Sequence, residues 1–455
     1  YNKIIFAVIL FLGLFGLAQS SEAANRYIRD GATGNGSDWT NAYTTLPATL
    51  VRGDTYYIAD GSYASYMVDD AVSGTLVITI KKATIFAHGT DTGWNSSYGD
   101  GQAVFAQPFN IITSYVTFDG VTGSGSDPNT YGFKIAIPTN CNQTNKMLGI
   151  PPVGYNYLNL SNITVSHVAM TNCGSGYDYN QIGIYSNPAT ATNITITYNY
   201  MANSSTNMQL LKWSNSIITN NYFDNNWSSA SCHGQQLSPA ISTNITFANN
   251  IMRNSQTGGI GFHRAVGTPA NANWSVYNNI AFNTDGRTIA MGIFGNADTR
   301  EDVVLNSEFH HNTFANINGG GSGSGIQFSG QTTASGNTAY NNLFYNSSHP
   351  RIVGGQVTHD YNAFFNSTGT IDSETNILQA TGDPFVDSVG GDYHLKLGAL
   401  AMDAGKTLLS PYNIDYDGIT RPQGSAWDMG AYEYVSAVPP PDTTPPSAPT
   451  GIVIE

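Results

Sequence analysis

One pattern, which occurs eight times between residues 162 and 366, constrains the fold of this chain more than any other feature of its sequence. The pattern is a run of β-branched residues that leads into N-N-x-Φ-x-N, where Φ is apolar; NITFANNIMRN and NWSVYNNIAFN are two examples. Aligned on the last position, every copy has asparagine there: Asn172, Asn203, Asn225, Asn254, Asn283, Asn316, Asn346 and Asn366. Seven of the eight copies also have asparagine four residues earlier, where the first copy has Val168.

The spacing of these copies, 20 to 33 residues, predicts a solenoid of β coils in which each copy forms one coil. The runs are β-branched and lack the i, i+3, i+4 spacing of a helix. Stacking coils about 4.8 Å apart places the aligned asparagines above one another. Asparagine tolerates the left-handed backbone of a tight bend and can hydrogen-bond to its own copy in the next coil. We therefore expect an all-β fold, a single-stranded parallel β-helix, with asparagine ladders that have a structural role.

Earlier segments are less regular but have the same character. GDTYYIADGSY (53–63), TLVITIKKAT (75–84) and NIITSYVTFDGV (110–121) are interpreted as further coils. In the last of these, alternation predicts that Val116 and Phe118 face inward. Residues 122–157 contain four prolines and little periodicity, so they are expected to form a long loop.

Composition and charge exclude some classes of partner. Charged residues make up 11% of the chain, against roughly 25% in an ordinary soluble domain. The 40% hydrophobic fraction is too high for a disordered chain. With 17 basic and 31 acidic residues the net charge is −14, which removes the positive surface that nucleic-acid binding requires.

The N-terminus indicates export. Residues 4–18 are apolar and follow Lys3, and Ser21 and Ala23 fit the small-residue rule for signal-peptide cleavage. About 15 apolar residues are fewer than the ~20 that a membrane-spanning helix requires. Residues 1–23 are therefore interpreted as a signal peptide of a secreted or cell-surface protein, which has no membrane span after cleavage.

The N-terminal and C-terminal segments of the chain, together with the repeat, resemble a known superfamily. The coils, with the opening YIRDGATGNGSDWTNAYTTL, resemble right-handed parallel β-helix proteins of the pectate-lyase-like superfamily. The stretch GDPFVDSVGGDYHLKLGALAMDAGK, with IDYDGITRPQGSAWDMGAYEY, is similar to the tail of bacterial β-helix proteins of the "choice-of-anchor" type. The resemblance covers residues 26–434 and implies a right-handed helix, while implying little about activity.

The expected domain organisation follows from these segments. After the signal peptide comes one β-helix domain, 24–434, made of an N-terminal cap with irregular coils (24–160), regular coils (161–370) and a C-terminal cap (371–434). A Pro-rich linker spans 435–449. Residues 450–455 resemble the start of a fibronectin type III module, so a downstream module is expected in a longer chain.

The C-terminal cap is expected to cover the exposed edge of the last coil. Its acidic residues allow two interpretations. Asp415, Asp417 and Asp428 would be the ligands of a calcium site. Alternatively Arg421 neutralises the same carboxylates in a polar lid without a metal, and this is the reading that we favour. Calcium is the one cofactor considered.

The scarce basic residues point to a candidate site. The second strand of three successive coils reads MQLLKWSN, CHGQQLSP and GIGFHRAV. Stacking would bring four candidate catalytic residues to one face: Lys212, His233, His263 and Arg264. Four further residues are candidates for substrate binding: Gln235 and Gln236 by hydrogen bonding, and Trp213 and Trp227 by stacking on sugar rings.

A local cationic cluster on an acidic protein suits an anionic extracellular polysaccharide. In lyases of the superfamily that the chain resembles, a base removes the proton next to a uronate carboxylate and cations neutralise that carboxylate. Here Lys212 or His233 would be the base, and Arg264 and His263 would bind the carboxylate. Two alternatives remain open: a non-catalytic carbohydrate-binding adhesin or surface-display protein, and a glycoside hydrolase. The last requires two carboxylates across a groove, for which Asp69 with Asp70 are weak candidates.

Overall fold

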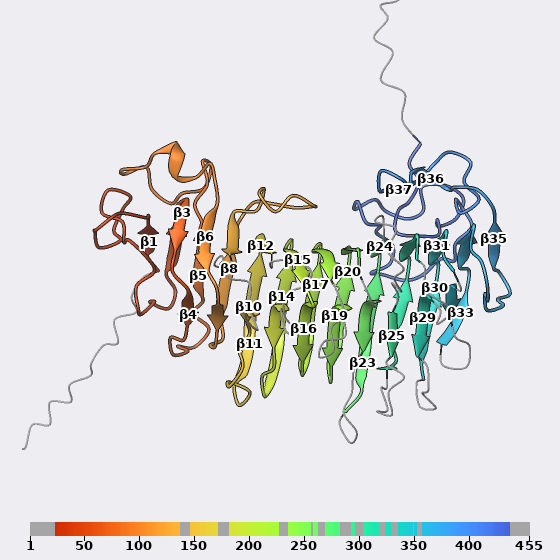
Figure 1. Ribbon diagram of the computed structural model, residues 1–455, viewed down its shortest axis with the longest axis horizontal. Coiled ribbons are helices and arrows are strands. Elements are labelled where there is room, and N and C mark those ends of the chain that lie inside the picture. Colours follow the sequence, from red (N-terminus) through yellow and green to blue (C-terminus); the bar gives the residue numbers. More distant parts are fainter. Residues whose placement is uncertain are drawn as a thin grey trace, which may run out of the picture.

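The protein is a right-handed parallel β-helix built from three long sheets (Figure 1). The computed structural model describes residues 23–136, 146–171, 182–226, 235–255, 258–262, 269–282, 293–295, 304–317, 324–328, 335–348, 350–352 and 357–436. In successive coils the chain passes through sheet A, sheet B and sheet C in turn. This confirms the fold class that the asparagine repeat predicts.

The strands of sheet A are β1 (Asn25–Ile28), β2 (Thr55–Ile58), β5 (Ile78–Lys82), β8 (Val116–Asp119), β11 (Asn159–Ser166), β14 (Thr190–Thr197), β17 (Trp213–Thr219), β20 (Thr243–Ala248), β23 (Asn271–Tyr277), β26 (Val304–Leu305), β27 (Glu308–His310), β30 (Asn337–Tyr340) and β33 (Val357–Asp360). Sheet B contains β3 (Gly61–Tyr63), β6 (Ala103–Ala106), β9 (Phe133–Ala136), β12 (Val168–Thr171), β15 (Tyr200–Ser204), β18 (Tyr222–Asn226), β21 (Ile251–Arg253), β24 (Ile280–Phe282), β28 (Thr313–Ala315), β31 (Leu343–Tyr345), β34 (Ala363–Phe365) and β35 (Leu378–Ala380). Sheet C contains β4 (Tyr66–Val68), β7 (Phe109–Ile111), β10 (Lys146–Gly149), β13 (Ile182–Ser186), β16 (Thr206–Leu211), β19 (Gln235–Ala240), β22 (Gly258–Phe262), β25 (Ile293–Gly295), β29 (Ser324–Phe328) and β32 (Pro350–Ile352). A short 3-10 helix, η1 (Ser96–Tyr98), and a hairpin of β36 (Phe385–Asp387) and β37 (Asp392–Leu395) lie outside the three sheets.

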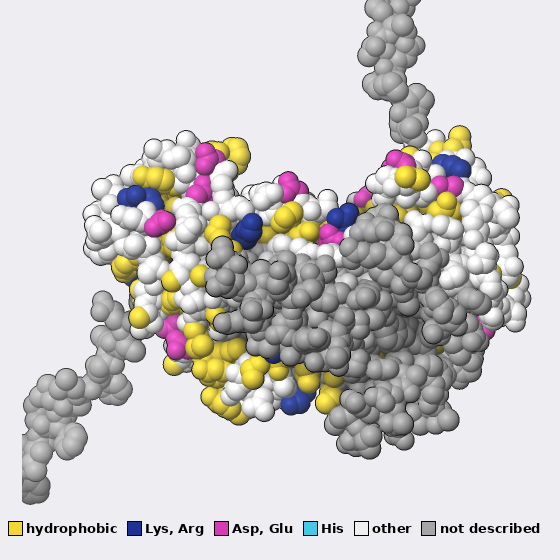
Figure 2. All heavy atoms as spheres, viewed as in Figure 1, with side chains coloured by type: hydrophobic (Ala, Val, Ile, Leu, Met, Phe, Trp, Pro, Cys, Tyr) yellow, Lys and Arg dark blue, Asp and Glu magenta, His cyan; other side chains and the backbone are white. Residues whose placement is uncertain are grey.

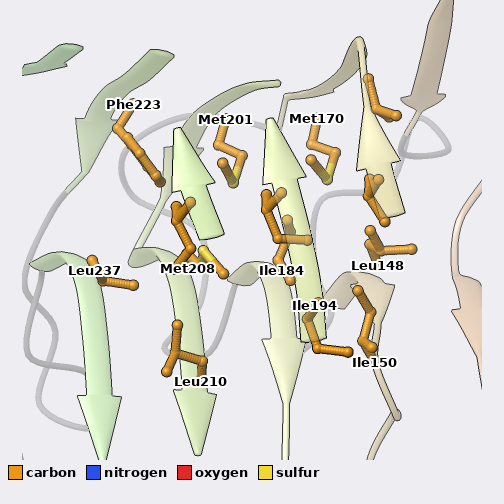
Figure 3. Packing of buried hydrophobic residues seen from close by; sticks show 14 of the residues in the cluster. Leu148, Ile150, Met170, Ile184, Ile194, Met201, Met208, Leu210, Phe223 and Leu237 are labelled. Atoms are coloured by element: carbon orange, nitrogen blue, oxygen red, sulfur yellow. The ribbon is translucent and has the colours of Figure 1, made fainter. Parts of the chain in front are cut away.

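The interior is a continuous apolar column. Side chains of the same kind stack from coil to coil because the strands pair in parallel and in register, as in Met170↔Met201 and Ile184↔Met208. Figure 3 shows methionines of sheet B facing leucine and isoleucine side chains of sheet C across this column. The alternation expected around Val116 is confirmed, since Val116 and Phe118 are fully buried.

A buried asparagine ladder holds the corner between sheets A and B. Its seven members are Asn199, Asn221, Asn250, Asn279, Asn312, Asn342 and Asn362. At each step the backbone N–H and the Nδ2 amide of one asparagine both donate to the Oδ1 of the next, at 2.9–3.1 Å. The ladder ends at Glu374, whose carboxylate accepts both donors of Asn362. The ladder therefore satisfies the polar groups of its own asparagine side chains inside the protein.

The asparagines at the last position of the repeat adopt the left-handed backbone that the sequence predicts. Among those that the structure describes, Asn203, Asn254 and Asn316 have φ of 57°, 54° and 55°. Side-chain bonds also link members of this row, as between Asn346 Nδ2 and Asn316 Oδ1 at 2.7 Å. Both rows of asparagine therefore have a structural role at corners.

One expectation about the N-terminal half is wrong. Residues 122–157 are not a single long loop, because they contain β9 in sheet B and β10 in sheet C. β9 pairs in parallel with β6 and β12, and β10 pairs with β7 and β13. The prolines lie outside these two strands, so they do not interrupt the ladders of hydrogen bonds.

The C-terminal segment does more than cap the last coil. Ile371 and Ile377 pack against the end of the apolar column, and Glu374 closes the buried ladder, as a cap would. Residues 383–434, which we call the tail, instead fold back along the outer face of sheet B (Figure 1). There the tail buries outward-facing side chains of β24, β28, β31 and β34. No helix in the described part of the chain is both long and apolar enough to span a membrane.

Candidate functional site

The outer face of sheet C carries the candidate site. Tyr185, Gln209 and Ser238 lie side by side on β13, β16 and β19, because Tyr185 pairs with Gln209 and Gln209 pairs with Ser238. The ammonium of Lys146, on β10, lies 4.1 Å from the centroid of the Tyr185 ring, a favourable cation–π contact. The three strands that the sequence places on one face, β16, β19 and β22, are indeed neighbours in this sheet.

Lys212 stands at one edge of this face, in the bend between β16 and β17. Its φ of 59° is left-handed, and its half-buried side chain extends toward the preceding coil. There Nζ donates to the carbonyl oxygen of Pro188 at 3.3 Å. This contact holds Nζ at the edge of the face, where a lysine side chain suits the binding of an anion.

The two glutamines lie at the opposite end of the strand from Lys212. Met208 pairs with Leu237, so Gln236 lies beside Asn207. Asn207 is five residues before Lys212, which corresponds to about 16 Å along the strand. Asn207 donates to Gln236 Oε1, and Gln236 Nε2 donates to the carbonyl of Arg253 at 2.7 Å. Gln235 is also buried. In this arrangement both glutamines belong to the internal packing of the bend between sheets B and C.

Trp213 belongs to the core. Its side chain is 1% exposed, and its Nε1 donates to Ser186 Oγ at 2.7 Å. The ring therefore presents no face on which a sugar could stack. The physical reason is the left-handed Lys212, which interrupts the alternation of the strand and turns the following residue inward.

The remaining candidates lie outside the described residues. Trp227 and His233 are in the segment that connects β18 in sheet B to β19 in sheet C, and His263 and Arg264 are in the segment that connects β22 in sheet C to β23 in sheet A. Of the eight candidate residues, only Lys212 is thus described at the edge of the outer face of sheet C.

The three candidate calcium ligands are not brought together as a ligand set. Asp415 accepts from the backbone N–H groups of Asp417, Ile419 and Glu433. Asp428 accepts from those of Asp403 and Tyr434, while Asp417 Oδ2 contacts His394 Nε2 at 2.7 Å. Among the described residues no group of three or more carboxylate, histidine or cysteine side chains is arranged to hold a metal.

Arg421 is at the centre of a polar lid in this part of the tail. Arg421 and Glu433 form a fully buried ion pair at 2.9 Å, and Arg421 also donates to the carbonyl oxygens of Gly430 and Ala431. Because the oxygens of Asp415 and Asp428 already accept backbone hydrogen bonds, we expect exhaustive chelation to leave the melting temperature unchanged. A clear drop in melting temperature with chelator, reversed by added Ca²⁺, would contradict this arrangement.

Sequence reasoning missed a histidine that the fold pairs with a carboxylate. His167 Nδ1 lies 2.9 Å from Asp119 Oδ1, and Ser166 Oγ donates to the same oxygen. Burial opposes ionisation of Asp119, but the hydrogen bonds from His167, Val121 and Ser166 outweigh it and hold the pKa of Asp119 below its usual value. The signal was present in the sequence: His167 occupies the bend where four of the seven later copies of the repeat have the first of two consecutive asparagines.

Comparison with known proteins bears on the fold. No family model and no curated protein matches this chain. Among solved structures, pectate lyase Pel9A superposes with a TM-score of 0.51 at 14% sequence identity, covering 91% of this chain and 97% of that one. The complex of XylC with xylose gives 0.48 at 9% identity, covering 90% and 98%, and the PL6 family alginate lyase AlyGC gives 0.40 at 13%, covering 73% and 51%.

The likeness to Pel9A places this chain in the architectural class of right-handed parallel β-helix proteins. At 14% identity it establishes the fold alone. Activity has to be argued from the residues on the outer face of sheet C.

Proposed function

We propose that the protein is secreted and acts on an acidic, uronate-containing polysaccharide by β-elimination. The observation that carries the proposal is the position of Lys212. Its Nζ is held at the edge of sheet C by a left-handed bend and by the Pro188 carbonyl. In the sequence, His233, His263 and Arg264 directly flank β19 and β22, which are strands of the same sheet. On a chain of net charge −14, such a concentration of basic residues suits an anionic ligand.

In the proposed reaction a base removes the proton from the carbon next to the uronate carboxylate. The electron pair forms a carbon–carbon double bond, the bond to the glycosidic oxygen breaks, and that oxygen takes up a proton. Lys212 or His233 is the candidate base. Lys212 can serve as that base or, with His263 and Arg264, as one of the cations that neutralise the carboxylate.

We expect Lys212→Asn to lower kcat/KM on the active polyuronate by about 10²- to 10³-fold, because a cation that stabilises the developing charge is lost. Asparagine is chosen because it accepts the left-handed backbone at this bend. The measurement is the absorbance of unsaturated products from a panel of polyuronates, with and without Ca²⁺.

The matched control is Lys396→Asn, which removes an exposed lysine of the tail and should leave the rate unchanged. Full activity in Lys212→Asn would overturn the role of this residue. Absence of product from every polyuronate, together with binding to one of them, would favour the alternative of a carbohydrate-binding adhesin or surface-display protein.

A glycoside hydrolase receives no specific support from the described residues. Asp70 Oδ1 accepts the backbone N–H of Leu50, and burial raises the pKa of Asp70. Its neighbour Asp69 adds no support, because no described contact places the two carboxylates on opposite sides of a groove. We therefore do not develop this alternative further.

A further inference from the structure

A surface on the side of the helix away from sheet C has features that its structural role does not require. At the bend between sheets A and B, one residue per coil adopts a left-handed backbone, with φ between 52° and 58°. Eight residues occupy this row: His167, Tyr198, Asn220, Asn249, Asn278, His311, Asn341 and Tyr361. Asparagine meets the conformational demand well, whereas histidine and tyrosine do so at a cost of about 1 kcal/mol or more each. An aromatic residue at such a position therefore suggests a second role.

The tail accounts for the aromatic residues at one end of this row. His311 is fully buried against Trp427 of the tail, at 5.4 Å between ring centroids, and Tyr361 packs into the apolar cluster that the tail covers. The other two, His167 and Tyr198, have no such cover. Tyr198 is 39% exposed, and the side chain of His167 is 22% exposed.

His167 and Tyr198 form an ordered aromatic platform. Their rings stack at 5.1 Å between centroids with only 2° between their planes. The next residue in the row, Asn220, is much smaller than an aromatic ring, so the far face of Tyr198 is not covered by a stacked ring from the row. Because the carboxylate of Asp119 can only accept, His167 Nδ1 carries the proton of their hydrogen bond. When the ring is neutral, Nε2 can accept a hydrogen bond beside the platform.

The neighbouring face of sheet B adds a fixed donor. Arg253 Nη2 donates to Asp224 Oδ2 at 2.8 Å, and its guanidinium lies 5.4 Å from the centroid of the Tyr222 ring. Tyr200 and Asn254 donate to the same carboxylate, so the pair is rigidly held. The side chain of Arg253 is 30% exposed, three coils or about 14 Å from His167 along the helix axis.

The strands β12 and β15 lie between the N-terminal loops and the tail (Figure 1). Figure 2 shows a depression between the N-terminal loops and the tail. On one side is the segment that follows β8. The centroid of its Tyr131 ring lies 6.0 Å from that of the Tyr200 ring. On the other side Tyr416 of the tail is close to Tyr198 and Tyr222: burial first, and then Asp417 and these two tyrosines, raise the pKa of Tyr416 to about 12.

We propose that the surface formed by His167, Tyr198 and Arg253 is a second carbohydrate-binding site, and that it takes uncharged sugar units of a polysaccharide chain lying along the helix axis. Tyr198 offers a ring face for stacking on a sugar, while His167 and Arg253 offer an acceptor and a donor for hydroxyl groups. Each polar member is already paired with a carboxylate, His167 with Asp119 and Arg253 with Asp224. The surface therefore has no excess positive charge, which disfavours a uronate and separates this site from the proposed one on sheet C.

The test measures binding, so it is independent of any lyase activity. Affinity electrophoresis through gels that contain dextran, galactan, arabinoxylan or polygalacturonate should show retardation by at least one neutral polymer. Tyr198→Asn restores the residue that the row uses elsewhere, so the fold should be kept, and we expect the apparent Kd to rise about five- to tenfold. Asn220→Tyr should lengthen the platform and lower the Kd.

The matched control is Tyr361→Asn, which makes the same change in the same row under the tail and should leave retardation unchanged. Circular dichroism melting of all variants checks that the fold is kept. Retardation by polygalacturonate alone, equal retardation of the wild type and Tyr198→Asn, or no retardation by any neutral polymer would each overturn the proposal.

Discussion

Replacing Asn250 with alanine should destabilise the protein by about 5 kcal/mol, because one side chain of the buried ladder satisfies several groups at once. Asn250 Oδ1 accepts from the backbone N–H and the Nδ2 of Asn221, and its own Nδ2 donates to the Ile218 carbonyl and to Asn279 Oδ1. All these groups are inside the protein, where water does not replace the lost partner. Each orphaned group costs about 1–3 kcal/mol.

The measurement is the midpoint of guanidinium unfolding, with amide hydrogen exchange at Asn221 as the local readout. Repeat arrays can lose cooperativity, so a local readout is needed beside the global one. The matched control is Asn244→Gly in the same coil. Asn244 is exposed and has a φ of 56°, which glycine adopts freely, so this change should cost less than about 1 kcal/mol. Equal effects of the two changes would contradict the role assigned to the buried ladder.

The contrast between these two asparagines also shows what the sequence could predict. The period and the alignment predict coils, corners and left-handed asparagines, because these depend on local conformation that each copy repeats. They do not tell that Asn250 is buried and Asn244 exposed. That depends on how the backbone turns each side chain: Asn250 follows the left-handed Asn249, whereas Asn244 is itself left-handed.

The sequence did not predict the buried orientation of Trp213 or the docking of the tail, and the reasons are related. Trp213 looks like an outward-facing aromatic beside Lys212, but a single left-handed residue resets the alternation and turns the indole inward. The docking of the tail involves residues more than 100 positions apart, such as Asn278 and Ile414, which no local pattern connects. A signal does exist: β24, β28, β31 and β34 are apolar or buried on both faces, which indicates strands that are covered from outside.

Acid should loosen the tail, since two neutral histidines are buried beneath it. His310 Nδ1 accepts the backbone N–H of Tyr340 at 3.1 Å, and His311 Nε2 accepts from Asn341 Nδ2 at 3.0 Å. A protonated ring would place an N–H against each of these donors. Burial, and then Lys406, lower the pKa of His310 to about 3; burial, Arg421 and His310 lower that of His311 well below its usual value.

The sign of the effect follows from these shifts. Both histidines have a lower pKa in the folded state, so below about pH 6.5 the unfolded chain binds more protons. The stability that they contribute is fully present above that pH and falls by about 1.4 kcal/mol per pH unit for each histidine as the pH decreases toward 3. Asp428 acts in the opposite direction, since burial raises its pKa to about 6, and the raised pKa of Asp415 adds to this offset.

The other charged groups at this interface do not remove the loss of stability that the two histidines cause at low pH. Glu308, which is on the same strand as His310, accepts from Tyr412 Oη, and Glu433 is paired with Arg421. Lys406 and Arg421 instead add positive charge on the side of the histidines. We therefore expect a net loss of stability between pH 6.5 and 4.5, seen first as faster protease cleavage within residues 383–434 while the coils stay intact.

His311→Asn separates the histidine effect from general acid denaturation. Asparagine occupies this left-handed position at Asn278 and Asn341, so the bend itself should tolerate the change. Between pH 6.5 and 4.5 the variant should lose less stability than the wild type, by about 1.4 kcal/mol per pH unit, because only His310 still titrates there. At pH 7.5 it should be no more stable than the wild type, since the contact with Trp427 is lost.

The control His394→Asn removes a histidine whose pKa is raised: burial opposes its protonation, but Asp417 and Asp392 outweigh that effect. Its contribution is present below about pH 6.5 and is lost at higher pH, so removing it should not lessen the acid sensitivity. An acid transition in His311→Asn as steep as that of the wild type would contradict the assignment to the buried histidines.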